Sequence, residues 1–316
     1  MEKRDLLLQI VHMYYGLGMT QEKIAKQLFF SRSRISHLIT EAEECGLVTF
    51  EIRQQISQNS ALQDFLCRQF HLHNAFVVDC SIFPKSEHFD RICKTAAEYL
   101  CTQLKEDTVL NVSRGHTMHG IVHNMRAFSP LPAMRVVQTE GMLLTGDLYL
   151  EQLDFVRRIA DMYACQYDFI MLPYLFDSPD LKRAVTDQSF AQSNLENKKD
   201  INLICSSISS LQQWRKYIRD DEYEWLVSHG AVGSIEGNFY DMNGNFLHPA
   251  LEQRCIIPSI SVLQKAEQLI CVCNGVYKAK SLLGVLRTGL VDTLITNAKL
   301  AAHIEQMTIN PTDSLN

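Results

Sequence analysis

The chain has 316 residues, of which 46% are hydrophobic and 21% are charged, and its formal net charge is −6 at neutral pH. This composition is that of an average soluble globular protein, and the length predicts two domains or three. The net charge argues against a wholly basic nucleic-acid binder. No run of about 18 apolar residues occurs, so no transmembrane helix is expected.

The start of the chain and its cysteines indicate a reducing compartment. Residues 1–5 carry charges of both signs, unlike a signal peptide, so we expect a cytoplasmic protein that does not contact a membrane. The ten cysteines begin at Cys45, end at Cys273 and show no zinc-binding spacing. We therefore expect free thiols, no metal site and no cofactor.

Charge is unevenly distributed along the chain. Residues 1–54 contain seven Lys or Arg and seven Asp or Glu, whereas residues 55–316 contain 23 and 29. In the first segment, basic residues cluster from Lys23 to Arg34 with no acidic residue between them. An acidic body is repelled by DNA phosphates, so contact with DNA should be made through this small patch.

The first fifty residues predict three short helices. Apolar residues recur at helical spacing over residues 6–14, and two glycines follow them. Thr20 is a favourable N-cap for a second helix, whose inner face includes Ile24. Phe29 stands in the turn after it, at a position where many such turns have glycine. Ser31 can cap a third helix.

The third helix has the properties of a recognition helix. Ile35 and Ile39 face inward, while the outward face near its start is basic and polar. The first residues of such a helix enter the major groove, where Arg bonds guanine edges and Ser or His reaches bases or phosphates. The predicted contacts to double-stranded operator DNA are Thr20, Gln21, Ser31, Arg32, Ser33, Arg34, Ser36 and His37.

Residues 47–52 alternate like a strand and predict a wing after the third helix. A small helical bundle without a DNA role is the alternative interpretation. Residues 54–60 are polar and predict a linker. The sequence therefore predicts a DNA-binding domain over residues 1–54.

Residues 55–316 predict an α/β domain. Helical stretches, including residues 88–104 and a segment ending near Phe128, alternate with short apolar strands. This alternation implies a mostly parallel sheet covered on both faces, with ligands bound at the carboxyl ends of the strands. The predicted fold is a winged helix-turn-helix joined to a Rossmann-like three-layer α/β/α domain. The predicted strands are residues 75–79, 109–112, 135–138, 169–172, 201–204, 269–273 and 293–295.

Two loops after predicted strands have features of an anion site. In residues 113–117, Gly115 lets backbone N–H groups approach a phosphate, Thr117 adds a hydroxyl, and a helix begins. An ordinary strand-to-helix turn is the alternative. In residues 273–278, Lys278 lies in the first turn of a helix, where the helix dipole disfavours a cation. An anionic ligand or simple solvation would explain this lysine.

A third loop, residues 230–244, is rich in glycine and contains Asp241. Its carboxylate either caps a turn or binds a ligand.

Taken in order, these segments resemble the SorC family of bacterial sugar-responsive regulators. The resemblance covers nearly the whole chain and rests on motifs at residues 20–46, 112–117, 137–141, 230–244, 274–279, 286–290 and 294–296. It implies an effector domain similar to sugar-phosphate isomerases and glucosamine-phosphate deaminases but without their catalysis. It also implies a phosphorylated sugar or polyol as ligand, and a homodimer or homotetramer on operator DNA.

The resemblance also implies roles for individual residues. Gly115 and Thr117 would hold the phosphate, Asp241 would accept hydrogen bonds from ligand hydroxyls, and Lys278 would pair with the phosphate or a hydroxyl. The full predicted effector set is Arg114, Gly115, His116, Thr117, Gly141, Asp241, Asn274, Gly275 and Lys278.

The pocket departs from the family pattern at several positions. Arg114 stands where the family usually has Trp, and Met142 and Asn274 stand where it usually has Gly. Residues 205–207 replace a glycine-rich turn. These changes suggest a different ligand or a weakened site, and Arg114 either adds a phosphate contact or fills the pocket.

We therefore predict a ligand-controlled regulator that is not an enzyme. A sugar-phosphate isomerase or deaminase is one alternative, for which Asp241 and His116 are the obvious candidate bases. A regulator that has lost its ligand is the other.

Overall fold

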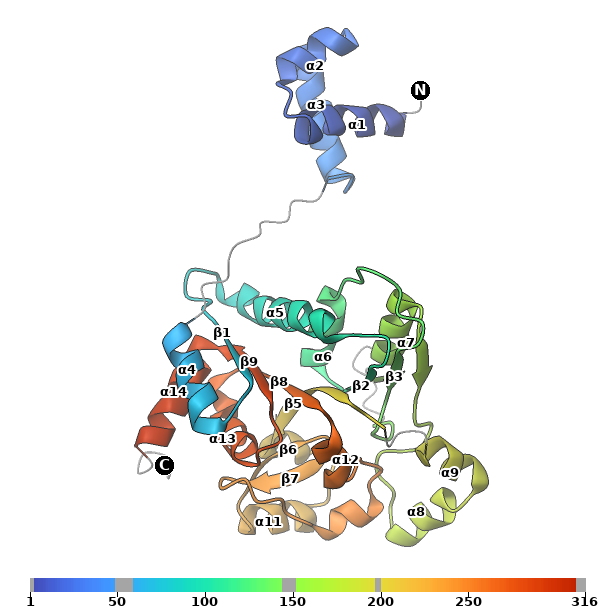
Figure 1. The fold of residues 1–316 in the computed structure, drawn as a ribbon, viewed down its shortest axis with the longest axis vertical. Helices are drawn as coiled ribbons and strands as arrows, with labels where there is room; N and C mark the ends of the chain where they lie inside the picture. Colours follow the sequence, from blue (N-terminus) through green and yellow to red (C-terminus); the bar gives the residue numbers. More distant parts are fainter. Residues whose placement is uncertain (1–2, 49–58, 144–151, 197–199, 311–316) are drawn as a thin grey trace. The chain divides into compact units, whose positions relative to one another are not determined.

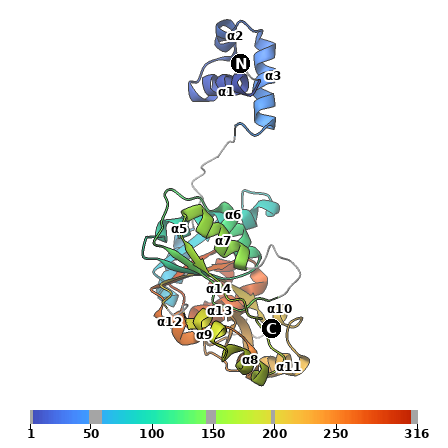
Figure 2. The ribbon, with the colours of Figure 1, turned by 90° about the vertical axis from the view of Figure 1, so that its right-hand side faces the viewer.

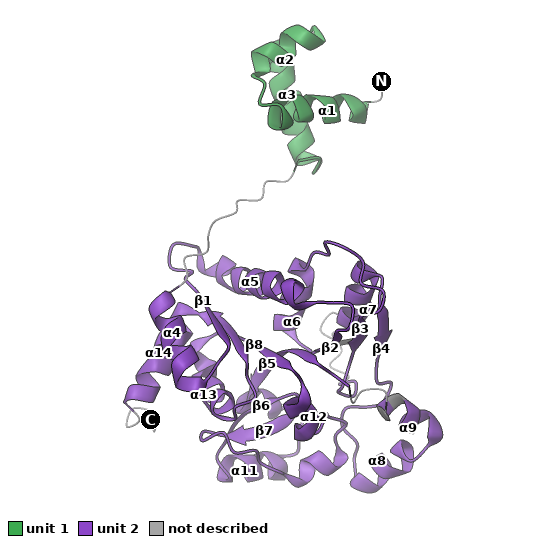
Figure 3. Ribbon diagram, viewed as in Figure 1, with its two compact units in different colours: residues 1–55 green, residues 56–316 purple. Residues whose placement is uncertain are grey.

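The computed structural model describes residues 3–48, 59–143, 152–196 and 200–310 (Figure 1). The chain divides into two compact units, residues 1–55 and residues 56–316 (Figure 3). None of the helices within these described ranges is long and apolar enough to cross a membrane.

The first unit is helical around a small apolar core. Ile10, Ile24, Ile35 and Ile39 from its three α-helices are buried together. Its elements are α1 (Lys3–Val11), the π-helix η1 (His12–Gly16), α2 (Gln21–Leu28) and α3 (Arg32–Glu44). This order confirms the predicted helical segment. The predicted wing strand is not seen at residues 47 and 48, and residues 49–52 lie outside the described residues.

Both predicted caps of the first unit are present. The Thr20 hydroxyl accepts a hydrogen bond from the Lys23 backbone N–H (3.3 Å), and the Ser31 hydroxyl accepts one from the Arg34 N–H (3.2 Å). These bonds satisfy N–H groups that a helix leaves free in its first turn, so they fix where α2 and α3 begin.

The turn between α2 and α3 has an unfavourable residue. Phe29 adopts a left-handed conformation (φ 57°), and 94% of it is exposed. A side chain in this conformation costs about 1–2 kcal/mol, because its Cβ approaches the following carbonyl oxygen. This explains why glycine is common at such a position.

The second unit is built on a largely parallel sheet. The strands of its main path are parallel, whereas β6 (Ala231–Ile235) and β7 (Asn238–Asp241) form an antiparallel hairpin attached to β5. The main path runs in the order β1 (Asn74–Val78), β9 (Thr293–Asn297), β8 (Gln268–Cys273), β5 (Leu203–Ser210), β2 (Val109–Val112), β3 (Arg135–Val137) and β4 (Gln166–Asp168).

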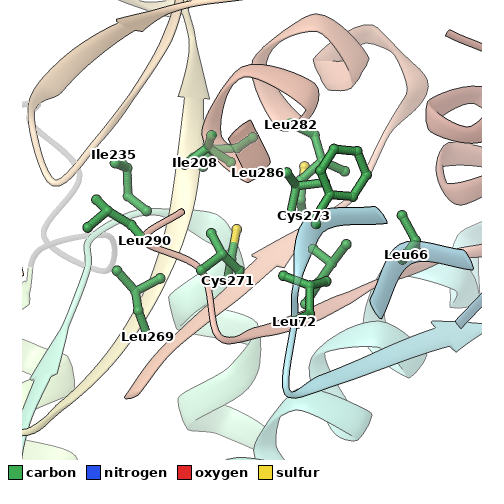
Figure 4. Close-up of a cluster of buried hydrophobic side chains, with 14 of the residues drawn as sticks. Leu66, Leu72, Ile208, Ile235, Leu269, Cys271, Cys273, Leu282, Leu286 and Leu290 are labelled. Atoms are coloured by element: carbon green, nitrogen blue, oxygen red, sulfur yellow. The ribbon is translucent and has the colours of Figure 1, made fainter. Parts of the chain in front are cut away.

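Helices cover both faces of this sheet, and Figure 2 shows the two helical layers from the side. Side chains of β8 alternate between the two layers. Ile270 and Val272 pack with one layer, and Cys271 and Cys273 pack with the other. The first layer contains α5 (His88–Gln103), α6 (His116–Asn124) and α7 (Gln152–Tyr163). The second contains α4 (Ser60–Phe70), α13 (Ala279–Arg287) and α14 (Ala298–Ile309), and Figure 4 shows part of its core. The predicted three-layer α/β fold is therefore confirmed.

The second unit contains further short helices. They are η2 (Lys85–Glu87), α8 (Pro179–Thr186), α9 (Ser189–Glu196), α10 (Leu211–Trp214), α11 (Asp220–Ser228), η4 (Ala250–Arg254), α12 (Ile260–Lys265) and η5 (Val276–Lys278).

The strand predicted over residues 169–172 is wrong. The strand is β4 (Gln166–Asp168), and Ile170 and Leu172 are buried in a separate cluster with Phe176 and Ile256. A short apolar run indicates burial without deciding between a strand and a packed loop.

Three other predicted boundaries also change. β5 continues to Ser210, so residues 205–207 lie in a strand and not in a turn. α4 begins at Ser60, capped by Asn59, so only residues 54–58 of the predicted linker remain, and they lie outside the described residues. α6 ends at Asn124, before the expected Phe128.

Replacing Phe29 by glycine should stabilise the first unit. Relief of the left-handed strain exceeds the entropy cost of glycine, so we expect a gain of about 0.5–1 kcal/mol in the free energy of opening α2 and α3. Native-state hydrogen exchange of these helices in the full chain measures this gain. Phe29→Ala removes the same exposed ring but keeps the strain, and equal gains in the two variants would contradict the backbone explanation.

Candidate functional site

The residues predicted to contact DNA are accessible in the first unit. Ser31, Arg32, Ser33 and Arg34 are exposed around the start of α3, as are Thr20 and His37, whereas Gln21 and Ser36 are half-buried. The Arg34 guanidinium lies over the Phe30 ring, 4.3 Å from its centre, which holds the side chain beside the turn. Thr20, Gln21 and Arg32 line one shallow hollow of the surface.

The second unit has a cavity of about 650 Å³ at the carboxyl ends of its central strands. It is lined by segments that follow β2, β5 and β8: residues 114–117, residues 207–217 in part, and residues 274–278. These strands are neighbours in the sheet, so their following segments converge at one edge. Parallel strand order therefore brings together two of the three loops singled out in the sequence.

The cavity lining is strongly cationic. Among the described residues, no Asp or Glu lines it. The side chains that carry or can carry positive charge there are Arg114, His116, Arg215, Lys216 and Lys278. Such a lining favours an anionic ligand.

Two glycines shape the cavity wall. Gly115 (φ 100°) immediately precedes α6, and Gly275 (φ 96°) precedes η5. A Cβ at Gly275 would lie 2.5 Å from the Tyr277 ring, whereas a Cβ at Gly115 would meet open space. Gly115 is therefore required by its backbone conformation, which leads the chain into the N-terminus of α6 beside the cavity. His116 and Thr117 are the first residues of that helix and also line the cavity.

Lys278 is a buried cation at the cavity. Only 7% of it is exposed, and its ammonium donates a hydrogen bond to the Ile208 carbonyl (2.7 Å). An ammonium has three donors, so this hydrogen bond to a carbonyl leaves donors that can bind a ligand. The simple solvation considered as an alternative does not explain this lysine.

The structure does not bring Asp241 to the cavity. Its carboxylate accepts hydrogen bonds from the backbone N–H groups of Asn243 and Asn245 (2.8 Å each) and from the Asn245 side chain (2.9 Å). Burial alone would raise the pKa of Asp241, but these hydrogen bonds lower it below its ordinary value. The turn-capping alternative therefore accounts for this residue.

Gly141 also lies outside the cavity lining. It is buried after β3, and a Cβ there would lie 2.6 Å from the Pro173 carbonyl oxygen. Close packing of two backbone segments explains the glycine. The cavity lining does include Arg114, Gly115, His116, Thr117, Asn274, Gly275 and Lys278.

Sequence reasoning missed a buried ionic cluster beside Arg114. The Arg114 guanidinium stacks over the Tyr174 ring, 4.3 Å from its centre, and its Nε lies 3.7 Å from Oε2 of Glu140. Glu236, in the tight turn between β6 and β7, accepts hydrogen bonds from Ser206 (2.6 Å) and Asn111 (3.0 Å). Both glutamates are 3% exposed.

Burial dominates the ionisation of this cluster. It raises the pKa of Glu140, which the positive charge of Arg114 partly offsets. Burial and the nearby Glu140 together raise the pKa of Glu236 to about 7. Two signals in the sequence pointed here: Glu140 closely follows a predicted strand, and Glu236 interrupts an apolar segment.

Together, the fold and the cavity define a two-part protein, in which a small helical unit accompanies an α/β unit with a cationic ligand cavity. A profile of the family described as "Putative sugar-binding domain" matches residues 54–304. The chain belongs to this family, the SorC-type sugar-binding transcriptional regulators.

Individual relatives cover both units. The chain is 26% identical to the deoxyribonucleoside regulator of Bacillus subtilis, over 95% of this chain and 97% of that protein. It is 22% identical to the sorbitol operon regulator of Klebsiella pneumoniae, over 95% and 98%. These relatives are transcriptional regulators and not enzymes.

Solved structures show the same fold. The full-length sorbitol operon regulator of Klebsiella pneumoniae superposes with a TM-score of 0.79 at 21% identity, covering 96% of this chain and 99% of that one. A transcriptional regulator of Streptococcus pneumoniae gives a TM-score of 0.74 at 18% identity, covering 79% and 98%.

Glu236 should make stability depend on pH. Its folded pKa of about 7 lies above the ordinary 4.5, so the folded state holds a proton that the unfolded state has lost between these values. Stability should therefore fall as the pH rises from about 4.5 through 7. Glu236→Gln keeps the shape and removes the charge. The native chain loses stability over this range and the variant does not. The free energy of unfolding of the variant minus that of the native chain should therefore increase by on the order of 2–3 kcal/mol as the pH rises from about 5 to 8.

Urea unfolding of both proteins across this pH range measures the difference. A difference that does not change with pH would show that Glu236 does not titrate in this window.

Proposed function

We propose that this chain is a DNA-binding transcriptional regulator whose operator affinity is controlled by a phosphorylated sugar or polyol bound in the cavity of the second unit. It acts in the cytoplasm and governs an operon for carbohydrate uptake or catabolism. The observation that carries this proposal is a cationic cavity, free of acidic side chains among the described residues, beside a helix N-terminus in a chain of this family.

A phosphate group suits the part of the cavity beside the start of α6. Backbone N–H groups at the start of α6 and the Thr117 hydroxyl supply neutral donors, and Lys278 supplies a charged one. Hydrogen bonds between a phosphate and a cation are about twice as strong as neutral ones. The hydrogen bond from Lys278 to the Ile208 carbonyl keeps the ammonium in place without neutralising it.

The first unit suits recognition of double-stranded DNA. The basic patch from Lys23 to Arg34 faces solvent at the start of α3, while the chain as a whole carries a net charge of −6. Operators read by helix-turn-helix proteins contain paired half-sites, so the regulator acts as a homodimer or homotetramer. The effector must bind two states of this oligomer with different affinity in order to change DNA binding.

Fluorescence anisotropy tests the proposal. A labelled duplex selected from a random-sequence pool by the purified protein serves as the operator, and its affinity is measured with and without each of a panel of sugar and polyol phosphates. One compound should shift the affinity by fivefold or more without being consumed. Consumption of the compound would indicate an enzyme, and an unchanged affinity with every compound would indicate a regulator without a ligand.

Arg34→Ala should weaken operator binding by about 1–3 kcal/mol, because an arginine that reads a base edge or pairs with a phosphate is lost. Ligand affinity should be unchanged, since the residue lies in the first unit. Arg4→Ala removes an exposed arginine from α1, outside the predicted contacts, and serves as the control. Normal operator affinity in the Arg34 variant would remove this residue from the interface.

Lys278→Ala should weaken the response to the effector phosphate by tenfold or more, because a charge-assisted hydrogen bond is lost. Operator binding without ligand should be intact. Lys280→Ala removes an exposed lysine of α13, two residues further along the chain, and should leave both properties unchanged. Loss of both properties in the Lys278 variant would mean that the lysine only supports the fold.

A further inference from the structure

Two adjacent phenylalanines in the turn between α2 and α3 have opposite surroundings. Phe30 packs against the apolar core of the first unit, and the Arg34 guanidinium lies 4.3 Å from the centre of its ring. Phe29, in contrast, is 94% exposed. Core packing therefore accounts for Phe30 but not for Phe29, whose ring is presented to solvent.

The backbone makes Phe29 a costly residue at this position. Its φ is 57°, and its backbone N–H donates to the Ala25 carbonyl, which ends α2. Glycine adopts this left-handed conformation without the steric penalty that a side chain incurs. Residues held in such conformations cluster at functional sites. A strained and exposed apolar side chain, at a position that suits glycine, indicates a role for the ring itself.

The turn leads directly into the predicted recognition helix. Phe29 precedes Arg32, the first residue of α3, by three residues, so their Cα atoms are at most about 11 Å apart. The first residues of a recognition helix enter the major groove, which is about 12 Å wide. Lys26, Arg32 and Arg34 are exposed on either side of the turn and attract the phosphates that border the groove. The Phe29 ring is therefore close enough to reach the edges of bases.

The chemistry of the ring selects the part of the DNA that it can contact. A phenyl ring carries no charge and no hydrogen-bonding group, so it gains nothing from a phosphate or from the polar edge of a base. The C5-methyl group of thymine is the apolar group that distinguishes one base from the others in the major groove, and phenylalanine is among the side chains that contact it. Thymine is therefore the complementary base.

We propose that Phe29 contacts the C5-methyl group of an operator thymine, beside the bases reached from the start of α3. Phe29 is then a specificity-determining residue, which adds a preference for thymine that a glycine in this turn could not provide. This inference rests on the DNA-binding part of the proposed function and adds to it the kind of base that the turn recognises.

Deoxyuridine substitution tests the methyl contact. Deoxyuridine pairs with adenine as thymidine does but lacks the C5-methyl group. Each thymidine of the duplex selected from the random-sequence pool is replaced in turn, and the affinity of the full chain is measured by fluorescence anisotropy. Replacement at one position of a half-site should weaken binding by the native chain about threefold to fivefold, which corresponds to the loss of one buried methyl group.

Variants of Phe29 assign that methyl contact to the ring. Phe29→Ala and Phe29→Gly should bind the thymidine duplex about threefold to tenfold more weakly, and should lose no further affinity when the same thymidine is replaced. Phe29→Leu keeps an apolar side chain and should keep most of the methyl dependence. Leu8→Ala removes an exposed leucine of α1, outside the predicted contacts, and should behave like the native chain.

Salt dependence separates loss of the ring from displacement of the helices. The slope of log affinity against log salt concentration reports the number of phosphates that the protein neutralises. A phenyl ring neutralises none, so the slope should be the same for the native chain and for every Phe29 variant. Displacement of α3 would instead break phosphate contacts and reduce the slope.

Two results would overturn the inference. One is a native chain whose affinity is unchanged by deoxyuridine at every thymidine position of the duplex. The other is a Phe29→Ala variant that keeps the native loss of affinity at the sensitive position. Enrichment of no duplex from the random-sequence pool would overturn the proposed function as well, so the two failures are distinguishable.

Discussion

The parallel register of β8, β5, β2 and β3 determines where this protein can bind a ligand. Parallel neighbours direct their carboxyl ends to the same edge, so segments separated by more than 100 residues in sequence meet above the sheet. The loop after β2 contributes Gly115, and the loop after β8 contributes Gly275 and Lys278. The register is held by two apolar cores, because slipping a strand by one residue would exchange the side chains that face them.

The ionic cluster at the same edge is hard to explain by stability alone. Glu140 and Glu236 are buried and Arg114 is half-buried, and apolar residues of similar volume often stabilise a fold as well as such ionisable groups or better. Within the described ranges, Nη1 of Arg114 and Oε2 of Glu140 have no hydrogen-bond partner, which adds to the cost. Arg114 connects this cluster to the cavity, because it lines the cavity and pairs with Glu140.

Arg114 was expected either to add a phosphate contact or to fill the pocket. Its guanidinium stacks on Tyr174 and lies beside Glu140, so neighbouring side chains hold it in place. It is also one of the lining residues, and its Nη1 has no hydrogen-bond partner among the residues that the structure describes. Arg114 therefore adds a cation to the wall of the cavity at a position where the family usually has Trp.

Much of the fold could be predicted because its signals are local. Thr20 and Ser31 marked helix starts, and the β2 boundaries at Val109 and Val112 followed from a short apolar run between polar segments. The prediction of a strand over residues 169–172 was wrong for the opposite reason, because these residues are buried by packing with the distant Ile256.

The same distinction between local signals and distant contacts applies to the residues of the candidate site. Gly115 and Lys278 follow strands directly, so the general rule for parallel sheets located them. Asp241 was misplaced because a carboxylate in a glycine-rich loop looks the same whether it caps a turn or binds a ligand. Glu140 and Glu236 escaped notice because their pairing with Arg114, Asn111 and Ser206 joins residues that are far apart in sequence.

The central claim is that effector binding and operator binding are coupled. Coupling between two sites is reciprocal, so a ligand that changes operator affinity by some factor must have its own affinity changed by the same factor when the operator is bound. The direct measurement is the effector dissociation constant of the full chain, determined by calorimetry with and without saturating operator duplex. We expect the two constants to differ by the factor that the effector imposes on operator affinity, fivefold or more. Equal constants would contradict the account.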